Sequence, residues 1–182
     1  MIRAMVVFVA VAIPLPAAAQ HATPYAGFEQ RSIKALSTQQ IDDLRQGRGM
    51  GLALAAELNG YPGPAHVIEL AERLELTPSQ LERARALFDA MKAETMPIGE
   101  RLIAQESQLD RLFVTKSITP ESLDATVAAI GSTNASLRGA HLKYHLAMLD
   151  VLTPVQAQRY FELRGYARTP NPHTPGGHQP HH

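Results

Sequence analysis

Histidine and methionine side chains in the second half of the chain have the spacing of a metal site. His141, His145 and Met148 follow one another at steps of four and three residues, so on a helix their side chains share one face. Imidazole nitrogens bind Zn, Cu and Ni, and a thioether favours Cu(I). His66, with Glu69 one turn later, is a candidate for a further ligand. The alternative is structural: His141 is a hydrogen-bonded residue of a helix seam, with His145 at the edge of that seam.

Four more histidines lie in the Pro-rich tail of residues 166–182, namely His173, His178, His181 and His182. The tail is too polar to form a core, so we expect it to be disordered. Its histidines either chelate a transition metal weakly or belong to a solvated segment without a specific role. Because neutral imidazole is the form that binds a metal, such chelation should weaken below about pH 6.5. We therefore expect no obligatory cofactor, with Zn, Cu or Ni as the candidate ligands.

The composition argues against several other classes of function. The 182 residues include 17 basic and 17 acidic side chains, so the chain has no net charge to attract nucleic acid. It has no cysteine, which excludes a disulfide framework and a Cys nucleophile. The sequence also contains no Ser/His/Asp arrangement, acid pair or cofactor-binding loop that would indicate an active site. We expect a binding protein rather than an enzyme.

The first 19 residues have the features of a secretory signal peptide. Arg3 precedes an apolar run over residues 4–13, and Ala17-Ala18-Ala19 forms a small-residue cleavage site. A membrane-spanning helix needs about 20 apolar residues, which is more than this run provides. We therefore expect cleavage after Ala19 and a periplasmic mature protein that does not span the membrane.

Short Thr-Pro sequences mark the starts of the principal helices. Thr77 and Thr153 are each followed by Pro at the first helical position and by Gln three residues later, which predicts a capping box. Thr119 has the same Pro but lacks the Gln. Ser37 with Gln40 predicts one further box, at the start of a short helix.

Apolar periodicity between these starts predicts a long antiparallel helical hairpin. The first helix runs from Pro78 for roughly 37 residues, or about 55 Å, and should bend at Pro97. In the second helix, a stripe that includes Asn134 alternates steps of four and three from Leu123 to Val151. Two such helices leave apolar surface uncovered, which flanking helices or a second copy of the chain would cover.

These elements predict an all-α fold with four segments. Residues 1–19 are the signal peptide, and residues 20–64 form an N-terminal arm and short helices, at 37–45 and 52–58, separated by glycines at 47, 49 and 51. Residues 65–165 form the hairpin domain, with short helices at 65–74 and 154–164, and residues 166–182 are the tail.

The two complete motifs, with the long bent hairpin and the signal peptide, resemble those of the Spy/CpxP family of periplasmic LTxxQ proteins and of the related heavy-metal sensor and resistance proteins. The residues that carry the resemblance are Leu76, Thr77 and Gln80 in the first motif and Leu152, Thr153, Pro154 and Gln156 in the second. The resemblance covers roughly residues 74–165. It implies that the hairpin forms a homodimer with the shape of a thin, curved cradle.

The resemblance also leaves two functions open. The first is an ATP-independent chaperone or envelope-stress protein that binds unfolded client proteins, with a membrane stress sensor as a further candidate partner. The second is a heavy-metal sensor or resistance protein that uses the helix and tail histidines.

Overall fold

The structure is a computed structural model of the chain, and it describes residues 24–166. The expected signal peptide and the four tail histidines lie outside this range. Within it all regular elements are helical: a short 3-10 helix η1 (Phe28–Gln30) and the α-helices α1 (Thr38–Arg45), α2 (Leu54–Glu57), α3 (Pro64–Glu69), α4 (Pro78–Val114), α5 (Pro120–Leu149) and α6 (Pro154–Leu163). This confirms the predicted all-α fold.

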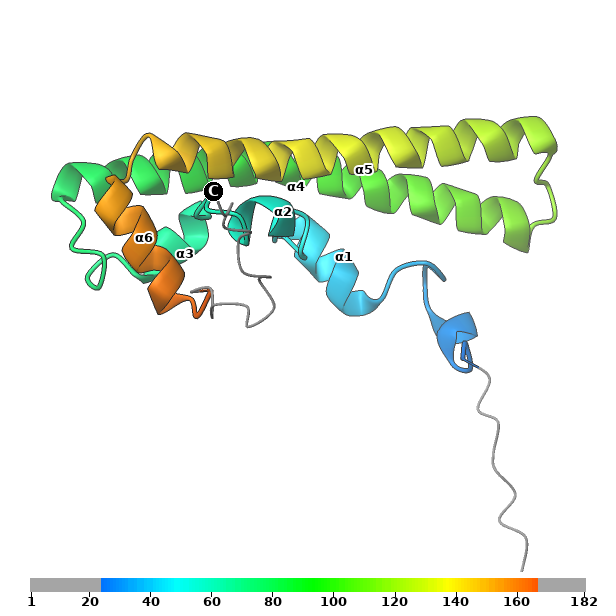
Figure 1. The fold of residues 1–182 in the computed structure, drawn as a ribbon. Coiled ribbons are helices and arrows are strands. Elements are labelled where there is room, and N and C mark those ends of the chain that lie inside the picture. The colour runs from blue at the N-terminus through cyan, green and yellow to red at the C-terminus, as the bar shows by residue number, and fades with distance from the viewer. Residues whose placement is uncertain (1–23, 167–182) are drawn as a thin grey trace, which may run out of the picture.

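The long helices α4 and α5 form an antiparallel hairpin, and the short helices lie along one side of it (Figure 1). Helix α4 has 37 residues, as the periodicity predicts, and continues through Pro97. In Figure 1 its second half slopes away from α5, so the helix changes direction near its middle. No helix in the described part of the chain is long and apolar enough to cross a membrane. The expected homodimer stays a prediction.

Full capping boxes begin four of the helices. Those at Ser37, Thr77 and Thr153 are confirmed as predicted. At Thr119, which lacks the Gln, Ser122 takes its place: its hydroxyl accepts the Thr119 N–H at 2.9 Å, and the Thr119 hydroxyl accepts the Ser122 N–H at 3.2 Å. A short hydroxyl can close the box because the third helical residue lies directly beside the cap residue.

The glutamines of the two motifs connect the starts of α4 and α6. Each uses its side-chain oxygen to accept the backbone N–H of its own cap residue, at 3.0 Å in both cases. The Gln80 amide donates to the Val151 carbonyl at 2.8 Å and to Gln156 Oε1 at 2.7 Å. The Gln156 amide donates in turn to the Leu74 carbonyl at 3.2 Å. Each motif therefore caps its own helix and holds the chain that leads into the other.

Two of the short helices are shorter than predicted. Helix α2 covers Leu54–Glu57 rather than 52–58, and α3 ends at Glu69 rather than Leu74. After α3 the chain turns through Glu75, which has a φ of 53°, so that it can reverse into α4. The glycine break is confirmed: Gly47 has a φ of 63°, and a Cβ there would lie 2.6 Å from Thr95 Oγ1.

Most of the buried apolar residues form two clusters along the hairpin. The first cluster joins α1 to the middle of α4 and α5 and contains Ile33, Leu44, Ile98, Leu102, Ile103, Leu137 and Ala140. The second cluster packs α3 and α6 against the start of α4 and the end of α5. It contains Val67, Leu74, Ala84, Met148, Val151, Leu152 and Tyr160. Leu76 packs at the edge of this second cluster, so the leucines of both motifs contribute to it.

The buried face of α5 departs from the predicted stripe. Val127 is 51% exposed, and Thr133 is buried in place of Asn134. A strict seven-residue repeat drifts by about 20° per heptad on a straight helix with 3.6 residues per turn, so the stripe rotates out of the interface. Asn134 is therefore exposed on α5 and lies outside the seam between α4 and α5.

We predict that replacing either motif glutamine destabilises the fold. Gln80→Ala and Gln156→Ala should each lower the free energy of unfolding by about 1–3 kcal/mol, because each leaves partly buried hydrogen-bonding groups unpaired. The double variant should lose less than the sum, since the two amides bond to one another. Urea unfolding gives these values, with Gln158→Ala as the control, because Gln158 pairs only with exposed Glu162. Losses no larger than that of the control would contradict a connecting role.

Candidate functional site

A cavity of about 250 Å³ lies among α2, α3, α4, α5 and the chain that follows α6. The side chains that matter for its chemistry are Glu57, His66, Met91, His141, His145 and Arg164. Along α5, the two histidines follow Leu137 and Ala140 of the first apolar cluster and precede Met148 of the second. The hairpin thus carries a polar layer between its two apolar clusters.

His145 is buried and firmly oriented. The structural alternative placed it at the edge of the seam, but its exposed fraction is only 8%. Its Nδ1 lies 2.7 Å from the carbonyl oxygen of Tyr61, and because a carbonyl can only accept, Nδ1 carries the proton and donates it. The lone pair of the neutral ring is then on Nε2. Gly63 makes room for this ring, since a Cβ at that position would lie 2.9 Å from His145 Cε1.

His141 has an unpaired nitrogen inside the protein. The side chain is 2% exposed, and its Nε2 has no hydrogen-bond partner. Burial lowers the pKa of His141, and the neighbouring His145 lowers it further, so the ring is neutral near pH 7. An unpaired polar atom in a protein interior is uncommon and calls for an explanation such as a bound water or an ion. The structural alternative expected His141 to be hydrogen-bonded in the seam. Within the described residues, His141 Nε2 makes no such bond.

Glu57 brings a carboxylate to the same cavity from the end of α2. Its Oε1 accepts a 2.5 Å hydrogen bond from the Tyr160 hydroxyl and lies 3.4 Å from Arg164 Nε. Its Oε2 has no hydrogen bond and lies 3.8 Å from His145 Nδ1. Burial, together with the bond to Glu57, raises the pKa of Tyr160 far above the physiological range, so this phenol remains a donor.

Sequence reasoning did not identify Glu57 as a site residue. A signal was present, because Glu57 is the only charged residue between Met50 and Gly60 in a run that is otherwise mostly apolar. A lone carboxylate on a buried face needs a partner in the interior.

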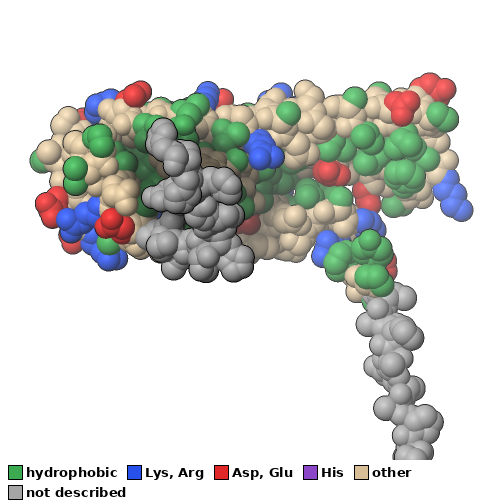
Figure 2. Space-filling view, viewed as in Figure 1, with side chains coloured by type: hydrophobic (Ala, Val, Ile, Leu, Met, Phe, Trp, Pro, Cys, Tyr) green, Lys and Arg blue, Asp and Glu red, His purple; other side chains and the backbone are tan. Residues whose placement is uncertain are grey.

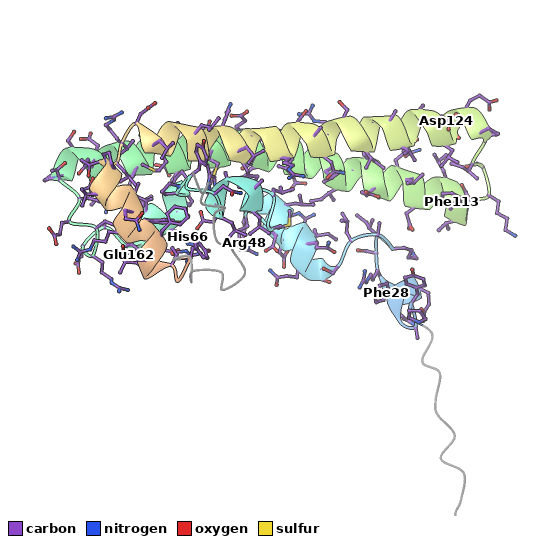
Figure 3. All side chains as sticks on the ribbon, in the orientation of Figure 1. Phe28, Arg48, His66, Phe113, Asp124 and Glu162 are labelled. Carbon is purple, nitrogen blue, oxygen red and sulfur yellow. The ribbon has the colours of Figure 1, made fainter. Side chains whose placement is uncertain are left out.

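The other predicted ligands lie in different surroundings. Met148 is fully buried in the second apolar cluster and does not line the cavity. His66 does line it, but its side chain is 39% exposed and its Nδ1 lies 2.8 Å from Glu69 Oε2. Figure 3 shows His66 beneath the hairpin, on the same side as Arg48. The structure thus brings His141, His145 and His66 to one cavity and separates Met148 from them.

The nitrogen and oxygen atoms in the cavity are of the kinds that bind a transition metal, although they are not arranged around a single metal position. In residues 24–166, no three His, Asp or Glu side chains already form a cluster that could hold an ion. The unpaired His141 Nε2 and Glu57 Oε2 nevertheless offer nitrogen and carboxylate donors of the kind that Zn uses. A metal would be held by His141, His145 and Glu57, with His66 at the more exposed side.

We predict that His141 makes the protein less stable in mild acid. Because the folded-state pKa lies below the ordinary value of 6.5, the unfolded chain takes up a proton first as the pH falls through about 6.5. The free energy of unfolding should therefore decrease from about pH 7.5 to pH 5.5, and His141→Gln should reduce this slope. Urea unfolding with EDTA present measures it. The matched control is His66→Gln; an equal slope in all three proteins would rule out the burial of a neutral His141.

A model of the Metal_resist family, described as heavy-metal resistance, matches residues 49–159, which is more than half of the chain. No curated protein and no solved structure matches. The matched region includes Glu57, both buried histidines and both motifs, and it confirms the resemblance drawn from the motifs. The chain therefore belongs to the heavy-metal resistance family.

Proposed function

We propose that the protein is a periplasmic sensor or buffer that binds a divalent heavy-metal ion, with Zn, Cu and Ni as the candidates, in the cavity that contains His141, His145 and Glu57. The observation that carries the proposal is the unpaired Nε2 of buried His141, which shares this cavity with His145 and Glu57. The family assignment supports the same class of function.

Three properties of the cavity favour metal binding. First, His141 is held neutral by burial, so no proton has to leave it before it binds an ion. Second, the Tyr61 carbonyl accepts the Nδ1 proton of His145 and so leaves Nε2 as the nitrogen available to a metal, as the partners of metal-bound histidines commonly do. Third, the carboxylate of Glu57 would offset the charge of a divalent ion in a buried place.

The proposed location and the proposed role of the tail rest on the sequence. The signal-peptide features of residues 1–19 favour export to the periplasm. The tail histidines, His173, His178, His181 and His182, would add a second, weaker set of ligands.

We predict that Zn²⁺ stabilises the folded body through the cavity. A full-length variant with all four tail histidines changed to Ala should still gain about 2.7 kcal/mol of unfolding free energy at a Zn²⁺ concentration 100 times the dissociation constant. Adding His141→Gln and His145→Gln should remove this gain, because the two nitrogen ligands are lost. Thermal unfolding with and without Zn²⁺, Cu²⁺ or Ni²⁺ measures the effect.

A control variant makes this experiment specific. His66→Gln removes a more exposed histidine and should retain most of the gain. Equal stabilisation with and without His141 and His145 would place the metal elsewhere and sink the proposal.

A second candidate function is client binding at the free end of the hairpin. Figure 2 shows apolar side chains gathered there, at the end of the hairpin that no short α-helix covers (Figure 1). Phe113 is 54% exposed and Val114 is 66% exposed beside the loop, and Val127 is 51% exposed on α5. Exposed apolar side chains that are not held in a core suit weak contacts with unfolded chains.

We predict that this surface, if it binds clients, does so without metal. The variant Phe113→Ser with Val114→Ser should reduce the suppression of aggregation of an unrelated protein, measured by light scattering in EDTA. Val155→Ser is the matched control, because Val155 is 78% exposed at the start of α6, on another helix. Suppression that survives the paired change, or that requires metal, would contradict this second function.

A further inference from the structure

Arg164 lies beside the cavity but outside the region that the family model covers, which ends at residue 159. It is the C-cap residue of α6. Its Nε is 3.4 Å from Glu57 Oε1, and one of its terminal nitrogens donates to the Tyr166 hydroxyl at 3.1 Å. It therefore links the carboxylate of the cavity to the end of the described chain.

Glu57 needs this positive charge. Its side chain is 8% exposed, and the Tyr160 hydroxyl that bonds to it is neutral. His145 is 3.8 Å away, but its Nδ1 proton points to the Tyr61 carbonyl. Within the described residues, Arg164 is the only permanently charged cation that forms an ion pair with Glu57.

The contact between Arg164 and Glu57 is nevertheless a loose one. Although Nε is buried and within ion-pair distance, it makes no hydrogen bond, so the geometry is not that of a directed pair. The Arg164 side chain is 29% exposed, which leaves its charged end a path toward water. By contrast, the Tyr160 bond to Glu57 is short, and Tyr160 is completely buried.

We propose, on the basis of the metal-binding function above, that Arg164 is the counter-ion of Glu57 in the metal-free protein and that a divalent metal ion displaces it. The ion and the guanidinium group would compete for one buried carboxylate, because two cations close together repel each other in an interior of low dielectric. Displacement separates Arg164 from Glu57 and disturbs its contacts with Tyr166. The Tyr160 bond keeps α6 attached, so only the end of the helix is released.

Thermodynamic linkage gives the proposal a direct test. If metal weakens the Arg164 contact, then loss of Arg164 must strengthen metal binding by the same factor. Arg164→Gln should therefore bind Zn²⁺ at least about fivefold more tightly than the wild type, in titrations of the full-length protein. Arg164→Lys keeps the charge and should remain close to the wild type.

The matched control is Arg159→Gln. Arg159 lies on the same helix and forms an exposed ion pair with Glu75 at 3.0 Å, so its replacement changes the net charge equally. Its Zn²⁺ affinity should equal that of the wild type. If both Gln variants bind Zn²⁺ more tightly than the wild type, the gain in affinity comes from the change in net charge alone, and the proposal is overturned.

A second measurement needs no substitution. Zn²⁺ should speed trypsin cleavage of the wild type after Arg164 and leave cleavage after Arg159 unchanged. Slower trypsin cleavage after Arg164 in the presence of Zn²⁺, or an unchanged Zn²⁺ affinity in Arg164→Gln, would overturn the displacement of Arg164 but not the proposed metal binding. If neither the wild type nor Arg164→Gln binds Zn²⁺ in the cavity, the proposed function fails and this inference fails with it.

Discussion

Gln80 and Gln156 join two helix starts that are 76 residues apart in the chain. A hairpin of two long helices has no fixed end of its own, because its apolar stripes continue along both helices. The paired amides fix one end: each completes a cap, and each donates to backbone on the opposite side. With that end fixed, α3 and α6 pack on the second apolar cluster, and Tyr160 of α6 meets Glu57 of α2. The cavity depends on this arrangement, since Glu57 and Arg164 reach it from helices that the fold must first bring together.

The position of the cavity follows from the order of residues on α5. Leu137 and Ala140 pack in one apolar cluster and Met148 in the other, while His141 and His145 lie between them. Burying polar groups at this place costs free energy unless each group finds a partner. His145 has a partner in the Tyr61 carbonyl, whereas His141 Nε2 and Glu57 Oε2 have none. Of the four buried side-chain atoms without a hydrogen bond in the described residues, all but Gln105 Oε1 belong to residues that line the cavity, and such a local imbalance is typical of sites that bind ligands.

Much of the fold was predictable because its signals are local. Thr77 and Thr153 are followed within three residues by everything a capping box requires, and the long apolar pattern after Pro78 specified a helix of the observed length. Predictions failed where distant residues decide the outcome. Helix α3 stops at Glu69 because the chain must reverse before α4, and no feature of residues 65–74 alone requires this. Thr133 rather than Asn134 is buried because small differences in helix period accumulate over many turns.

Only part of the candidate site could be predicted from the sequence, because some of its contacts join residues that are distant in the chain. The pairing of His141 with His145 depends on helix spacing, and the structure places both in one cavity. The partner of His145 is Tyr61, 84 residues earlier, and that of Tyr160 is Glu57, 103 residues earlier. Met148 shares the helix with the histidines, but α3 and α6 enclose it in apolar surroundings.

The uncovered end of the hairpin has a consequence for local unfolding. Beyond Ile103 on α4 and before Ile130 on α5, neither helix contributes a residue to the two apolar clusters. Helix segments with few buried contacts open at a lower free energy than the whole domain, so their amide hydrogens exchange with solvent sooner. The loop end can therefore separate and reclose many times during the life of one folded cavity. The protein behaves as two regions of unequal stability, with the polar layer protected in the more stable one.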